Sequence, residues 1–184
     1  MKEVKNEKNK LFIYVMLFFT LAFIGWCFEV LNEIRKGHGF INRGVLHGPW
    51  LPIYGCGGLL IYLLLKKYKD KPVIVFVFSF FISALVEYLT SFYLELTKGM
   101  VWWDYSKKPF NLNGRICLGY TLIFAIFATL LYYFVIPKIL ELLKKINYKY
   151  LSILSILLLC LYLTDNIYSM KKPNVVRGAH IVKK

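Results

Sequence analysis

Residues 72–96 read PVIVFVFSFFISALVEYLTSFYLEL, and this stretch contains no lysine or arginine. As a helix it would be about 37 Å long, at about 1.5 Å per residue, which exceeds the ~30 Å hydrocarbon thickness of a bilayer. Its two charged residues are Glu87 and Glu95. Together with Ser83 and Ser91 they recur every four residues, so all four fall on one helix face. The stretch therefore predicts a transmembrane helix that carries one polar stripe.

Four other apolar blocks accompany this stretch in a chain of 184 residues, of which 58% are apolar. A soluble domain is about 45–50% apolar, so this composition excludes a soluble enzyme and a disordered chain. The predicted fold class is all-α: a polytopic membrane helical bundle with about five transmembrane helices. We expect one transmembrane domain over residues 1–170 and a basic tail over residues 171–184. The predicted spans are Leu11–Leu31, Trp50–Leu65, Pro72–Leu96, Ile116–Pro137 and Tyr150–Met170.

Positive charge surrounds the apolar blocks. The chain has 24 lysines and arginines against 10 acids, a formal net charge of +14, and every one of the 24 lies outside the predicted spans. We therefore expect these cations to meet the headgroups of a lipid bilayer, and we expect no binding to nucleic acid. The cations divide evenly between the two membrane faces. Short, lysine-dense connections favour an N-terminus inside, in a multi-pass protein of the bacterial cytoplasmic membrane.

Two of the connections are unlike simple linkers. Residues 37–58 and 102–117 are rich in aromatic residues, glycine, proline and asparagine. Glycine and proline set special backbone angles, and tryptophan and tyrosine suit the headgroup level. We expect both segments to be structured loops on the same membrane face as the C-terminal tail. The second span is short, and its glycine-rich start at Gly55, Gly57 and Gly58 is compatible with an irregular or re-entrant stretch.

Several carboxylates lie inside the predicted spans, nearer the face with the two loops. Glu87 lies 15 residues into its span and Asp165 lies 15 residues after Tyr150. A lipid-exposed carboxylate costs about 2.5–3.5 kcal/mol, so these acids should face the bundle interior, with Arg43 and Arg115 as counter-ions. The pairs either only fasten the loops to the bundle or line a polar cavity for a substrate or proton. The candidate pocket residues are Glu29, Asn42, Arg43, His47, Tyr54, Glu87, Glu95, Trp103, Asp104, Tyr105, Asn111 and Arg115.

Recognisable catalytic and metal-binding motifs are absent from the sequence. There is no phosphate-binding Gly-x-x-x-x-Gly-Lys-Ser/Thr, no His-Glu-x-x-His and no Cys-x-x-Cys. His47 could carry a proton, but a zinc site needs three or four ligands, so a solvated loop histidine is favoured. We expect no cofactor and no metal, and we assign no catalytic residue. The residues do not decide whether the protein is an enzyme, and they favour a protein that is not one.

A set of motifs over the first four spans resembles a bacterial membrane-protein family, described as putative ABC-transporter type IV or CmpB-like. The resemblance implies a permease-type subunit whose ATPase is a separate polypeptide. Glu87 and Glu95 belong to the pattern. The remaining motifs are Gly25-Trp26-x-x-Glu29, Asn42-Arg43-Gly44-x-Leu46-x-Gly48-Pro49-x-x-Pro52-Ile53-Tyr54-Gly55, Trp103-Asp104-Tyr105 and Asn111-Leu112-x-Gly114-Arg115-Ile116-Cys117-Leu118.

Three functions are compatible with these residues. The first is a permease-type transport component with a polar intramembrane pocket, working with a separate ATPase subunit or as a homo-oligomer, because five spans make a thin pathway. The second is an intramembrane enzyme acting on a lipid or lipid-linked substrate, in which arginines hold a phosphate and Glu87 or Asp104 serves as general base. The third is a non-catalytic accessory or sensor subunit whose acid–arginine pairs are purely structural.

Overall fold

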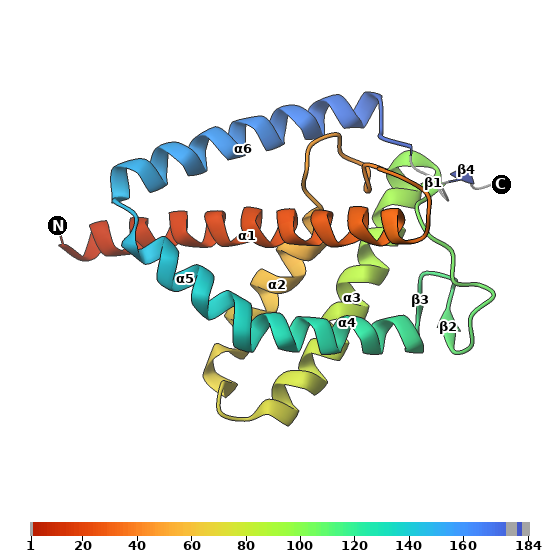
Figure 1. The fold of residues 1–184 in the computed structure, drawn as a ribbon, viewed down its shortest axis with the longest axis horizontal. Coiled ribbons are helices and arrows are strands. Elements are labelled where there is room, and N and C mark those ends of the chain that lie inside the picture. Colours follow the sequence, from red (N-terminus) through yellow and green to blue (C-terminus); the bar gives the residue numbers. More distant parts are fainter. Residues whose placement is uncertain (1, 176–179, 182–184) are drawn as a thin grey trace.

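The computed structural model describes residues 2–175 and 180–181, and its described part is a bundle of helices (Figure 1). Two pairs of very short antiparallel strands decorate one end of the bundle. The helices are α1 (Lys2–Arg35), α2 (Pro52–Leu65), α3 (Pro72–Lys98), α4 (Leu118–Leu130), α5 (Ile136–Lys145) and α6 (Tyr148–Lys171). The strands are β1 (Met100–Val101) with β4 (His180–Ile181), and β2 (Asn111–Leu112) with β3 (Ile116–Cys117). The prediction of an all-α membrane bundle is confirmed.

Four stretches in the described part of the chain are long and apolar enough to cross a bilayer. They cover residues 9–35, 72–98, 118–145 and 148–171. The fourth predicted span ends too early, because the chain continues past Pro137 into α5. A π-helical turn at Leu131–Val135 joins α4 to α5 and leaves Pro137 in the first turn of α5. Proline has no N–H to donate to the preceding turn, and the π-helical turn directly before it is a common irregularity at such a point in a helix.

The second predicted span is a short helix, and the irregular segment lies before it. Helix α2 has 14 residues, about 21 Å of helix, which is less than the hydrocarbon thickness. The segment before it, residues 36–51 (the first loop), runs back along α1 (Figure 1). Its last residue, Leu51, donates its backbone N–H to the carbonyl of Ala22 over 3.1 Å, near the middle of the α1 span. Irregular backbone at such a depth is tolerated only where protein covers it.

The glycines of the second span lie inside α2, although the sequence suggested an irregular start there. Gly55 and Gly58 allow α2 to pack closely against α1. A Cβ atom at Gly55 would lie 2.7 Å from the ring of Phe18, and one at Gly58 would lie 2.7 Å from Leu21. A Cβ atom at Gly25 on α1 would likewise collide with the ring of Tyr54. The missing side chains let the two helices approach and bring Tyr54 onto the polar side of α1.

The two loops and the chain after α6 meet at one end of the bundle, as the sequence predicted. Asn174 follows α6, and its Nδ2 donates to the carbonyls of Asn42 and Gly44 in the first loop, at 2.8 and 3.0 Å. Trp102 belongs to the segment of residues 99–117 (the second loop), and its indole N–H donates to the Asn174 carbonyl at 3.3 Å. The predicted basic tail thus begins as a packed segment. Its residues 176–179 and 182–184 lie outside the described part.

Candidate functional site: buried acids beneath the two loops

Four polar side chains from four different segments form one group, here called the inner cluster: Glu29, Tyr54, Glu87 and Tyr105. The hydroxyl of Tyr54, in the first turn of α2, donates to Glu29 Oε1 over 2.7 Å. The hydroxyl of Tyr105, in the second loop, donates to Glu87 Oε1 over 3.1 Å. Glu29 and Glu87 interact electrostatically although they stand on different helices. The cluster therefore joins α1, α2, α3 and the second loop.

Glu87 is the most buried acid of the inner cluster. The residue is 4% exposed, and its Oε2 atom has no hydrogen-bond partner within the described part of the protein. A buried carboxylate oxygen without a partner is costly, because the desolvation of the charge is not repaid. The position therefore calls for a group that the chain itself does not supply, such as a proton or a polar ligand.

Each of the two loop arginines pairs with one acid. Arg43 Nε lies 3.6 Å from Glu29 Oε2. Arg115 lies two helical turns from Glu87, at Glu95, with Nη2 at 2.6 Å from Glu95 Oε2. It also donates from Nη1 to Ser91 over 3.3 Å. Arg115 thus fastens the second loop to the polar stripe of α3, whereas Glu87 binds Tyr105.

The guanidinium of Arg115 is held on several sides. Its Cζ lies 5.7 Å from the ring centre of Tyr88 and 5.4 Å from that of Phe92, within the range of cation–π attraction. Its backbone carbonyl accepts the indole N–H of Trp103 over 2.8 Å. Its Nε atom is buried without a partner in the described part of the chain.

The fold of the second loop places Tyr105 over α3. The carboxylate of Asp104 accepts from the backbone N–H of Ser106 at 2.8 Å and from the Ser106 hydroxyl at 3.0 Å. Asn111 Nδ2 donates to the carbonyls of Ser106 and Lys108. Gly114 has φ +67°, a region that favours glycine, and its carbonyl accepts the Tyr105 N–H at 2.7 Å. The sequence candidates Trp103, Asp104 and Asn111 therefore shape the loop and lie outside the inner cluster.

The phenol of Tyr105 keeps its proton in this environment. Its ring stacks on that of Tyr120 with the centroids 4.9 Å apart. Burial raises the pKa of Tyr105 far above its ordinary value, and the nearby Glu87 carboxyl raises it further. Tyr105 is therefore a hydrogen-bond donor at any physiological pH.

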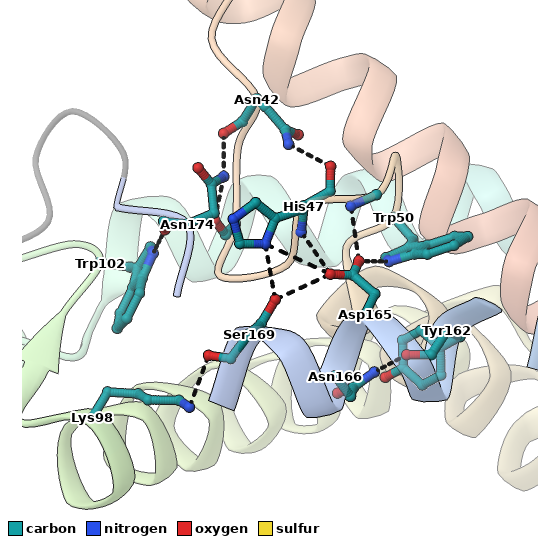
Figure 2. A network of polar contacts seen from close by, with 12 residues as sticks. Asn42, His47, Trp50, Lys98, Trp102, Tyr162, Asp165, Asn166, Ser169 and Asn174 are labelled. Atoms are coloured by element: carbon teal, nitrogen blue, oxygen red, sulfur yellow. Dashed lines mark hydrogen bonds and ion pairs between the residues drawn. The ribbon is translucent and has the colours of Figure 1, made fainter. Parts of the chain in front are cut away.

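A second polar network centres on Asp165 of α6 and holds the first loop (Figure 2). The carboxylate of Asp165 accepts the backbone N–H groups of His47 at 3.0 Å and Gly48 at 2.8 Å. It also accepts the indole N–H of Trp50 at 2.8 Å and the hydroxyl of Ser169 at 3.0 Å. One side chain thus satisfies three donors of an irregular segment that runs at membrane depth.

His47 and Asn42, two further sequence candidates, belong to this second network. His47 Nδ1 lies 3.0 Å from the Ser169 hydroxyl, and its side chain is 43% exposed. Asn42 accepts the indole N–H of Trp26 at 2.6 Å and donates to the His47 carbonyl at 2.7 Å. Sequence reasoning placed Asp165 on the loop face but gave it no partner, and it missed Ser169. The signal for both was their spacing of four residues on one helix.

The predicted candidates thus divide into the inner cluster, the two arginine–acid pairs, the network around Asp165 and the residues that shape the second loop. In the residues that the structure describes, no three histidine, cysteine or acidic side chains converge as metal ligands would. The arrangement combines buried carboxyls and phenols with two guanidinium groups that are held by Glu29 and Glu95. Such a set can hold a proton or a small polar group.

Comparison with known protein families identifies the family of this chain. The model of the family described as putative ABC-transporter type IV matches residues 16–170, which includes both loops and every sequence candidate named above. Neither the curated proteins nor the solved structures yield a match.

Proposed function

The chain belongs to the putative ABC-transporter type IV family, and from this premise we propose that it is the permease-type component of a transport system. A transport-related membrane protein follows from the family and from the four long apolar helices. The finer proposal is that the inner cluster takes part in the solute path. The observation that carries it is Glu87, buried at 4% exposure with one oxygen lacking a partner.

The position of the inner cluster supports a path that opens toward the loop face. The irregular first loop leads directly into α2, and Tyr54 stands in the first turn of that helix. In many transporters, irregular backbone beside the end of a short helix forms the binding site, because such backbone is tolerated where it lines a polar interior. Tyr105 comes from the second loop, so a movement of this loop would uncover Glu87.

A partner ATPase would bind the opposite face in this proposal. That face carries the short lysine-rich connection at residues 66–71 and the turn between α5 and α6, and the proposed orientation puts it inside the cell. The exposed surface there is small, so a homo-oligomer would present a larger docking area. The lysines on this face would also contact anionic lipid headgroups of the cell membrane.

The test of the proposed function is ATPase activity that accompanies the protein. We expect a tagged chain, purified from its native membrane in mild detergent, to carry ATP hydrolysis activity that repeated washing does not remove. The Glu141→Gln control changes an exposed acid that pairs with Lys145, and it should keep that activity. Glu87→Gln should remain inserted and bound to the ATPase but lose the solute-dependent part of hydrolysis. Repeated recovery of the chain without ATPase activity would contradict the proposal.

A double-mutant cycle separates this role from a purely structural one. Arg43 and Glu29 are 3.6 Å apart and about one-fifth exposed. In an accessory subunit whose pairs only fasten the loops, each single alanine variant should lower stability and the double variant should recover part of it. In a transport component, the double variant should recover stability but not function. Thermal unfolding and the hydrolysis assay, run on the same four proteins, decide between the two.

A further inference from the structure

The polar groups around Glu87 come from several elements. Helix α1 contributes the acid Glu29, α2 contributes the phenol of Tyr54, and the second loop contributes the phenol of Tyr105. Helix α4 contributes Tyr120, which stacks on Tyr105. The loop guanidinium groups bind elsewhere, Arg43 at Glu29 and Arg115 at Glu95.

The two oxygens of Glu87 have different surroundings. Oε1 accepts a hydrogen bond from Tyr105 at 3.1 Å, whereas Oε2 is buried without a partner among the described residues. The ionised form of Glu87 is therefore destabilised in two ways. Its unpartnered oxygen has lost its water, and the nearby acid Glu29 repels its charge. Taking up a proton removes both costs, because the neutral acid is far cheaper to bury.

From these contacts we infer that Glu87 is a proton-binding site, occupied while the second loop covers it. A proton from water forms an O–H bond on the Glu87 carboxylate, and the carbonyl oxygen of the resulting acid accepts from Tyr105. Departure of the second loop admits water, and the same O–H bond then breaks and returns the proton to water. The link between this exchange and solute movement rests on the proposed transport function, but the proton site itself does not.

A proton fits the site better than a metal ion does. In the described part of the chain no three histidine, cysteine or acidic side chains gather, so the ligand set of a divalent ion is missing. A proton needs no cavity, and it needs only the bare oxygen that Glu87 provides. Burial raises the pKa of the Tyr105 phenol, so Tyr105 keeps its own proton and does not transfer it to Glu87.

Infrared spectroscopy of the whole protein in lipid nanodiscs tests the inference, because a protonated carboxyl has a C=O band that a carboxylate lacks. An ordinary glutamate is ionised at about pH 7, so a carboxylic acid band at this pH reports a buried neutral acid. We expect the band in the wild-type protein and in the Glu141→Gln control, and its loss in Glu87→Gln. A wild-type protein without the band, or a Glu87→Gln variant that keeps it, would overturn the inference.

A second variant decides the matter if Glu87→Gln fails to assemble. Tyr105→Phe keeps the ring that stacks on Tyr120 and removes only the hydroxyl that donates to Glu87. The carboxylic acid band should then move to higher frequency, because its C=O loses a hydrogen bond. An unshifted band would place the proton on another acid and refute the assignment.

Added salt distinguishes a proton from another cation. The band should be unchanged when sodium or potassium chloride is raised at constant pH, and its loss would mean that a metal cation replaces the proton, against the inference. The spectra need no ATPase, so absence of the band and absence of an associated ATPase are separate results. The proton site can therefore fail while the transport proposal stands, and the reverse.

Discussion

Replacement of Asp165 by alanine should release the first loop from α6. Three donors of the loop, namely the N–H groups of His47 and Gly48 and the indole N–H of Trp50, lose their acceptor together. A hydrogen bond to a charged group is worth about 1.5–3 kcal/mol, and part of this is regained because water reaches His47. We therefore expect the variant to lose about 3–5 kcal/mol of the free energy that holds the loop.

Hydrogen exchange by mass spectrometry in nanodiscs measures this loss directly. A change of about 3 kcal/mol raises the opening equilibrium by roughly 100-fold, so the amides of residues 44–48, 50 and 51 should exchange faster by that factor. Asp165→Asn should give a smaller effect, since its amide keeps one acceptor oxygen but turns an NH2 group toward the loop donors. Amides in the middle of α3 should keep their protection, because that helix reaches the network only at its last residue, Lys98.

The matched control changes an acid that lies outside the network. Asp70 is exposed in the connection between α2 and α3, at the other end of the bundle, and Asp70→Asn should leave the exchange of the first loop unchanged. If Asp165→Ala accelerates exchange by less than about fivefold, roughly 1 kcal/mol, then water replaces the carboxylate without penalty. The account of Asp165 as the acceptor for an irregular intramembrane segment would then be wrong.

Two further results follow from the packing and from the second loop. Gly25→Ala should cost about 1–3 kcal/mol in thermal unfolding, because its Cβ meets the ring of Tyr54, whereas Gly119→Ala has open space and should be neutral or slightly stabilising. In alkaline titration, the contribution of Tyr105 to stability should be constant below about pH 10 and then fall, because the unfolded chain loses the Tyr105 proton first while burial and Glu87 hold the pKa of the folded phenol higher. Tyr105→Phe should make that fall shallower, and an unchanged slope would contradict the burial of this phenol.

The arrangement of contacts inside the site could be anticipated only in part. The sequence predicted that arginines from the loops would neutralise acids on the spans, and Arg43 does so at Glu29. The sequence could not tell which acid Arg115 would contact, because Glu87 and Glu95 lie on the same face of α3. The position of the second loop along the helix axis decides that Arg115 reaches Ser91 and Glu95. The sequence likewise indicated no partner for Asp165, since the loop that binds it is more than a hundred residues away in sequence.

The chain alone determined that this is a helical membrane protein and which end of the bundle carries its polar groups. Both conclusions follow from local quantities, the length of an apolar block against the bilayer and the depth of Glu87 within its block. Tertiary structure alone decided that the first loop runs back to the middle of α1, and that Glu87 receives a phenol in place of a guanidinium. Those outcomes depend on how closely α1 and α2 approach at Gly25 and on how the two loops fold against each other. No local sequence pattern encodes this approach or this packing.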